Sequence, residues 1–92
     1  MTNAIGPGAS LTLYGRAWCH LCDDMRAALG PFLTEFGMQL EVIDIDADPA
    51  LEARYNDWVP VLVLEGVELC HYHLDETRLR AALTAHSATP RR

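Results

Sequence analysis

The sequence predicts a small α/β domain whose elements follow the order β-α-β-α-β-β-α, with four strands in one mixed sheet flanked by three helices. The chain has 92 residues, of which 50% are hydrophobic and 22% charged, as in a single folded globular domain. Apolar residues recur at helical spacing in one long segment, and short apolar runs elsewhere have the length of strands. A strand, a helix and a strand in succession form a right-handed parallel crossover, and an added hairpin makes the sheet mixed.

The first half of the chain predicts a strand followed by a long helix. Leu11 to Tyr14 form a short strand that ends at Gly15. The apolar residues after it recur at spacings of three and four, which places them on one face of a helix from about Cys22 to Phe36. These residues are Met25, Leu29, Phe32, Leu33 and Phe36. We expect this face to lie in the core and the helix to end at Gly37.

The second half predicts a strand, a short helix, a hairpin and a last helix. The expected ranges are 40–45, 49–55, 61–64 with 67–70, and 75–85. Residues 40–45 are largely apolar, which is typical of a strand buried in an α/β sheet. Asp48-Pro49 has the pattern of an N-cap followed by the first residue of a helix. Glu65-Gly66 separates two apolar runs and therefore predicts a tight hairpin turn.

Composition and charge indicate how the domain is organised and which classes of partner are disfavoured. We expect a flexible leader at residues 1–10, one domain at residues 11–86 and a polar tail at residues 87–92. The formal net charge of -6 repels phosphate backbones and anionic lipid headgroups, which disfavours nucleic acid and membrane surfaces as partners. No apolar run approaches the roughly 20 residues that span a bilayer. We therefore expect a cytoplasmic protein that acts as a monomer.

The chemistry of the chain centres on Cys19 and Cys22, which lie at the junction of the first strand and the first helix. Three cysteines cannot all pair internally, and a reducing compartment holds them as thiols, so a structural disulfide framework is not predicted. Unpaired N–H groups and the helix dipole at a helix N-terminus stabilise a thiolate, which is the nucleophilic form of cysteine. The same spacing is also half of a zinc site, so redox chemistry and metal binding both remain open.

In the redox interpretation, Cys19 attacks a disulfide and Cys22 resolves the mixed disulfide that forms. Arg16 and a protonated His20 would add positive charge beside Cys19, whereas nearby aspartates oppose the thiolate. A solvent-facing His20 without a role is the alternative reading of that residue.

The stretch from Tyr14 to Cys22, followed about forty residues later by Val59-Pro60 before an apolar strand, resembles the glutaredoxin-like and thioredoxin-like families. The resemblance covers residues 11 to 85 and is closest to an outlying glutaredoxin-like group. It implies a thioredoxin-like fold of glutaredoxin size and thiol-disulfide oxidoreductase activity. It also implies a cis peptide bond at Pro60 and a Val59 backbone that docks an extended substrate. The side chain of Trp58 has an apolar body and a polar edge, which suits either a place beside that substrate or packing in the fold.

The chain departs from the family pattern at two places. His-Leu stands between the two cysteines, and Cys70-His71-Tyr72-His73 replaces the glycine pair with which glutaredoxins hold glutathione. The prediction therefore includes no cofactor and keeps glutathione only as a candidate reductant. The expected partner is a disulfide-bearing protein or a small thiol.

Two other functions remain as alternatives to the oxidoreductase. A zinc site would use Cys19, Cys22, Cys70 and one of the nearby histidines, whereas the favoured interpretation has no metal and treats Cys70 as a small buried apolar residue. A redox-inert interaction module is the other alternative, because a fold does not determine a function.

Overall fold

The computed structural model describes residues 10–88 and contains the predicted elements in the predicted order. They are β1 (Ser10–Gly15), α1 (His20–Phe36), β2 (Gln39–Asp44), the 3-10 turn η2 (Ile45–Ala47), α2 (Pro49–Tyr55), β3 (Val61–Leu64), β4 (Val67–His71) and α3 (Glu76–Ala88). Of the expected leader and tail, residues 1–9 and 89–92 lie outside the described residues. None of the helices within residues 10–88 is long and apolar enough to span a bilayer.

The four strands form one mixed sheet in the order β2-β1-β3-β4. β1 runs parallel to β2 and antiparallel to β3, and β3 runs antiparallel to β4. β1 and β4 therefore point in the same direction. The end of β1, the start of β3 and the end of β4 thus meet along one edge of the sheet, the edge formed by the ends of the strands. The register places Tyr14 opposite Val61 and Val61 opposite His71 at this edge. The loop that leaves β1, the loop that enters β3 and the loop that leaves β4 are thereby neighbours.

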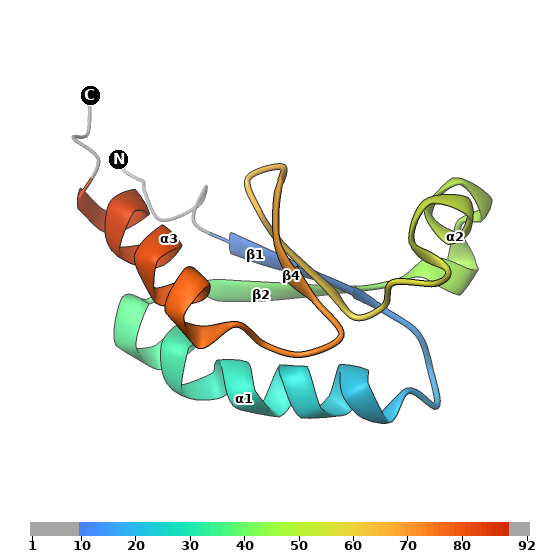
Figure 1. Cartoon of the computed structure of the whole chain (residues 1–92), viewed down its shortest axis with the longest axis horizontal. Coiled ribbons are helices and arrows are strands. Elements are labelled where there is room, and N and C mark those ends of the chain that lie inside the picture. The colour runs from blue at the N-terminus through green and yellow to red at the C-terminus, as the bar shows by residue number, and fades with distance from the viewer. Residues whose placement is uncertain (1–9, 89–92) are drawn as a thin grey trace.

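Side chains alternate between two hydrophobic clusters on the two faces of the sheet. α1 and α3 cover one face, as Figure 1 shows, and α2 lies near the sheet end where β1 and β2 finish. The larger cluster contains Met25, Leu29 and Phe32 from the predicted helix face, with Leu33 and Phe36 partly buried against it. The smaller cluster joins Tyr55 of α2 to Val61 and Val63 of β3. The prediction that the apolar stripe of α1 belongs to the core is confirmed.

The predicted burial of the strand at residues 40–45 is wrong. β2 is an edge strand, and Val42 is 47% exposed while Leu40 and Ile43 are half-buried. Ile45 is fully buried, but it lies in η2 after the strand has ended. Within residues 10–88, β2 has a sheet neighbour on one side only, so its apolar content does not imply that both of its faces are covered.

Local sequence signals at the ends of the elements act as predicted. The Asp48 side chain accepts a hydrogen bond of 2.9 Å from the backbone N–H of Ala50 and caps α2, with Pro49 in its first turn. Gly37 ends α1 in the left-handed conformation at φ 63°. The hairpin turn also has two residues with positive φ, Glu65 at 49° and Gly66 at 83°, which is the geometry that joins two antiparallel strands tightly.

Candidate functional site

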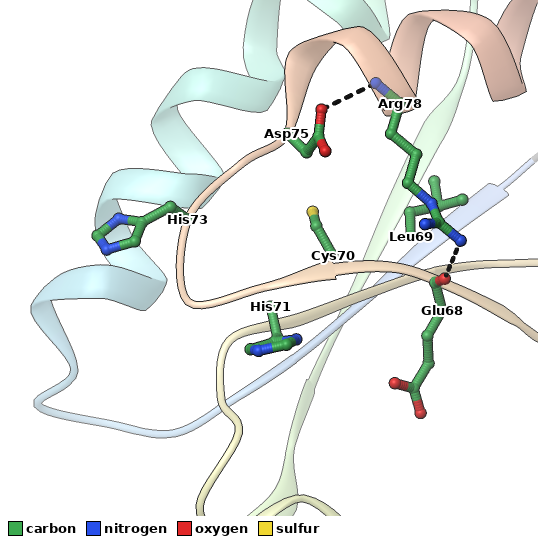
Figure 2. Close-up of a pocket in the computed structure, with 7 residues that line it drawn as sticks. All are labelled: Glu68, Leu69, Cys70, His71, His73, Asp75 and Arg78. Carbon is green, nitrogen blue, oxygen red and sulfur yellow. Dashed lines mark hydrogen bonds between the residues drawn. The ribbon is translucent and has the colours of Figure 1, made fainter.

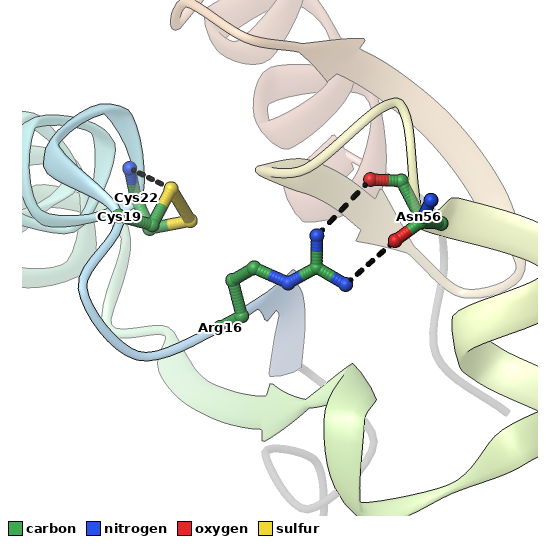
Figure 3. The surroundings of a disulfide bond; sticks show 4 residues. All are labelled: Arg16, Cys19, Cys22 and Asn56. Carbon is green, nitrogen blue, oxygen red and sulfur yellow. Dashed lines mark hydrogen bonds between the residues drawn. A yellow bond between two sulfur atoms is a disulfide. The ribbon is translucent and has the colours of Figure 1, made fainter.

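Cys19 and Cys22 form a disulfide at the start of α1 (Figure 3). Cys19 is the N-cap residue, with an extended backbone, and its Sγ accepts a hydrogen bond of 3.1 Å from the backbone N–H of Cys22. Cys22 lies inside the first turn, and the two Cα atoms are 5.2 Å apart. The sulfur of Cys19 is thereby held at the positive end of the helix dipole, where a backbone donor also stabilises negative charge.

The two sulfurs differ in exposure. Cys19 is half-buried, whereas Cys22 is 8% exposed and packs beneath the end of β1. A Cβ atom built at Gly15 would lie 3.0 Å from the Sγ of Cys22, closer than real Cβ atoms normally approach. Gly15 thus leaves the room that the buried sulfur occupies. An incoming thiol or disulfide can reach Cys19 more easily than Cys22.

The two residues expected to add positive charge lie in different surroundings. His20 is the first residue of α1, directly after Cys19, and its side chain is exposed. The guanidinium of Arg16 extends away from the disulfide in Figure 3 and bonds Asp46 and Asn56. The hydrogen bond to Asp46 raises the pKa of Arg16 above its ordinary value. The structure therefore does not bring the charge of Arg16 to the sulfur of Cys19.

The residues expected to dock a substrate precede β3 at the same edge of the sheet. The Val59–Pro60 peptide bond is cis, Pro60 is buried and Val59 is half-buried. Val61, the next residue, pairs with Tyr14, so Pro60 lies close to the loop that carries the disulfide. Trp58 is 49% exposed, and its ring lies edge-on to His71 at 5.3 Å between centroids. The indole thus combines packing contacts with a solvent-exposed face.

Two residues at this edge were missed in the sequence. Tyr72 follows β4, and its backbone N–H donates to the carbonyl of Pro60 at 2.9 Å while its hydroxyl donates to the carbonyl of Asp57 at 2.6 Å. Tyr72 has a positive φ of 65°, for which a tyrosine carries no sequence signal. Asn56 follows α2 and bonds Arg16 through its backbone and side-chain oxygens. Only the three-dimensional structure identifies these partners.

Cys70 lines a cavity of about 390 Å³ to which neither Cys19 nor Cys22 contributes. The cavity is lined by Glu68, Leu69, Cys70, His71, His73, Asp75 and Arg78. Burial raises the pKa of the Cys70 thiol. Figure 2 shows the side chains of His71 and His73 directed away from its sulfur. Among residues 10–88, no three His, Cys, Asp or Glu side chains are grouped so that they could hold a metal ion. The ligands of the alternative zinc site are therefore not assembled here.

The chain is similar to a protein family and to several known proteins. Residues 10–84 match the family model described as Glutaredoxin-like domain (DUF836). The solution structure of protein Ne2328 from Nitrosomonas europaea is 45% identical and has a TM-score of 0.74, with the match covering 89% of this chain and 98% of that protein. Uncharacterized protein Rv0508 of Mycobacterium tuberculosis is 35% identical over 74 residues, 75% of this chain and 76% of that protein.

A more distant likeness confirms the predicted fold. Oxidised mitochondrial thioredoxin 3 from Saccharomyces cerevisiae has a TM-score of 0.61 at 16% identity. The match covers 85% of this chain and 78% of that protein. Together with the four-stranded mixed sheet and three α-helices, this likeness establishes a thioredoxin-like fold.

Proposed function

Because the chain belongs to the glutaredoxin-like domain family, we propose that it is a thiol-disulfide oxidoreductase that exchanges disulfides through Cys19 and Cys22. One observation supports this proposal most strongly. The half-buried sulfur of Cys19 caps α1 and is paired with a buried cysteine in the first turn of the same helix. A helix N-terminus is a place where proteins stabilise a reactive thiolate.

The proposed reaction begins with the reduced protein. The thiolate of Cys19 attacks one sulfur of a substrate disulfide, the Cys19–substrate bond forms, and the other substrate sulfur leaves as a thiolate. Cys22 then loses its proton and attacks the Sγ of Cys19, which releases the second substrate sulfur. The substrate gains two electrons and, with two protons, becomes a dithiol, while the protein acquires the Cys19–Cys22 disulfide. The reverse sequence oxidises a substrate dithiol.

The proposed substrate is a disulfide-bearing protein or a small thiol that docks at the edge of the sheet beside Cys19. The backbone of Val59, next to the cis bond to Pro60, would hold an extended substrate, and the exposed face of Trp58 would contact it. His20 is exposed beside Cys19 and would tune its reactivity, a role that we do not extend to Arg16. The proposed setting is the reducing cytoplasm, with the protein as a monomer.

Cysteine substitutions test the proposal directly. Cys19→Ser should abolish the reduction of a model peptide disulfide, because the attacking sulfur is lost. Cys22→Ser should retain the first attack and accumulate the mixed disulfide, which intact-mass spectrometry detects. Cys70→Ser is the matched control, because its sulfur lies beside a different cavity, and it should keep the full rate.

Redox titration separates this function from the alternatives. In buffers of varied ratio of reduced to oxidised glutathione, the Cys19–Cys22 couple should convert from dithiol to disulfide along a two-electron curve. A couple that forms no disulfide at any ratio would indicate a redox-inert module. About one zinc per chain in protein prepared without added metal would instead favour the metal-binding alternative. Full activity of both Cys19→Ser and Cys22→Ser would exclude the proposed reaction.

A further inference from the structure

Residues 56–60, the segment that carries the proposed docking residues, lie between α2 and β3 and belong to no helix or strand. Such connecting backbone is ordinarily the more mobile part of a fold. Its local bonds gather at its first end: the N–H of Asn56 donates to the carbonyl of Glu52 at 2.9 Å, the N–H of Trp58 donates to the carbonyl of Tyr55 at 2.8 Å, and the side-chain amide of Asn56 donates to Asp57 at 3.3 Å. Residues far away in the sequence add further bonds at both ends.

Arg16 fastens the first end of segment 56–60. Its Nη1 donates to the backbone oxygen of Asn56 at 3.3 Å, and its Nη2 donates to the side-chain oxygen of the same residue at 2.8 Å. The Nη2 atom also pairs with Asp46 at 2.9 Å. Because Arg16 belongs to the loop between β1 and α1, its guanidinium joins the loop that carries Cys19 to η2 and to segment 56–60.

The Nε atom of Arg16 also indicates that the bonds of its guanidinium to η2 and to segment 56–60 are favourable. This atom is buried and has no hydrogen-bond partner. A buried donor without a partner is unfavourable, so a side chain adopts such a position only where its other contacts outweigh the loss. Here those contacts are the ones that the two Nη atoms make with Asp46 and Asn56. The bonds that Arg16 makes thus go to η2 and to segment 56–60.

Tyr72 bonds segment 56–60 at two further points. Its hydroxyl bonds the carbonyl of Asp57 at 2.6 Å, and its backbone N–H bonds the carbonyl of Pro60 at 2.9 Å. The ring also stacks on Trp58, with 6.1 Å between centroids. Tyr72 holds a left-handed backbone at φ 65°, a conformation that persists in a bulky residue only where surrounding contacts impose it.

We propose that Arg16 and Tyr72 are positioning residues that hold segment 56–60 from its two ends, so that it is preformed beside Cys19 for a disulfide-bearing polypeptide. This inference rests on the proposed function. A preformed segment lowers the affinity loss that ordering would otherwise cause when a substrate binds. Neither side chain is directed at the reacting sulfur, so loosening the segment affects the binding of an extended substrate and leaves the reactivity of Cys19 itself unchanged.

Conservative variants test this assignment in a Cys70→Ser background. Arg16→Lys keeps the positive charge but loses the planar fork that bonds Asn56 twice. Tyr72→Phe keeps the ring and loses the bond to Asp57. Arg80→Lys is the matched control, because Arg80 forms an ion pair with Glu35 at 2.7 Å between α3 and α1. Each variant is assayed with a peptide disulfide and with a small aromatic disulfide that has no peptide backbone to dock.

We expect Arg16→Lys and Tyr72→Phe each to raise KM for the peptide disulfide by about threefold to tenfold, the factor that corresponds to the loss of about one net hydrogen bond. The rate with the small disulfide and the kcat for the peptide should match those of Arg80→Lys. An unchanged KM for the peptide would overturn the proposal. Equal losses with both substrates would also overturn it, because they would place the effect on Cys19 or on the whole fold.

Amide hydrogen exchange supplies a readout that does not depend on activity. In both variants the amide of Trp58 should exchange faster than in Arg80→Lys, while the amide of Leu29 in α1 reports that the fold is intact. If the parent protein reduces no disulfide, the proposed function fails, and the exchange rates still decide whether Arg16 and Tyr72 hold the segment. Unchanged exchange at Trp58 in both variants would refute that role.

Discussion

Gly15→Ala should make the Cys19–Cys22 disulfide easier to reduce. The added methyl would lie 3.0 Å from the Sγ and 3.4 Å from the Cβ of Cys22. In the oxidised protein the bond to Cys19 restrains this sulfur, so it cannot withdraw freely. In the reduced protein the Cys22 side chain is free to change its rotamer, and much of the crowding is relieved. The substitution therefore penalises the disulfide more than the dithiol.

The size of the effect follows from the energy of overpacking. An extra methylene in a well-packed site costs about 1–3 kcal/mol. For a two-electron couple, about 30 mV corresponds to 1.4 kcal/mol, so the reduction potential should rise by about 20 to 65 mV. Replacing glycine by alanine also lowers the conformational entropy of the unfolded chain. This effect is the same for both redox forms, so it cancels in the reduction potential. The potential thus isolates the contact between the methyl group and the sulfur.

The assay is a titration against glutathione buffers, with the thiols trapped by alkylation and counted by mass spectrometry. Gly30→Ala is the control, because a Cβ there meets nothing within 4 Å beyond its own helix and chain neighbours, and its potential should equal that of the parent. A potential that stays unchanged or becomes more negative in Gly15→Ala would refute the reasoning that the missing Cβ makes room for the buried sulfur.

Three further predictions concern reactivity and stability. Burial raises the pKa of the Cys70 thiol, so near neutral pH the reduced protein should be alkylated at Cys70 more slowly than a free cysteine. The alkylation rate should still rise at higher pH. A time course followed by mass spectrometry measures these rates, and equal rates for Cys70 and the free cysteine would contradict the prediction. Asp48→Ala removes the cap of α2 and should lower the free energy of unfolding in urea by about 1 kcal/mol, and an unchanged midpoint would argue against the cap. Leu29→Ala should cost about 2–5 kcal/mol in the same experiment because Leu29 is fully buried, whereas Val42→Ala at the exposed strand should stay within about 0.5 kcal/mol; similar losses for both would contradict the assigned burial.

Elements specified by local rules could be predicted from the sequence. The spacing of Met25, Leu29 and Phe32 indicates one buried helix face because helical periodicity is a property of neighbours in the chain. Asp48-Pro49 starts α2 and Gly37 ends α1 for the same reason. The cysteine pair could also be predicted as the reactive site, because the residue pattern places it between a strand and a helix.

Features that depend on distant partners could not be predicted. The apolar content of β2 indicates a strand, but only the sheet order reveals that it lies at an edge. Arg16 stands three residues before Cys19, which favoured a role in tuning the thiolate. Its guanidinium instead bonds Asp46 and Asn56, 30 and 40 residues further along the chain. The position of Tyr72 likewise follows from bonds across the fold and not from the residues that flank it.

The exposure of β2 has a consequence for behaviour in concentrated solution. An open strand with apolar side chains is a template on which a second chain can extend the sheet, the first step of aggregation. β2 alternates those side chains with Glu41 and ends at Asp44, both exposed, and the net charge of -6 adds repulsion between copies. Like charges brought together in such a contact repel each other, so we expect the acidic side chains to disfavour pairing of β2 with a second copy of the chain.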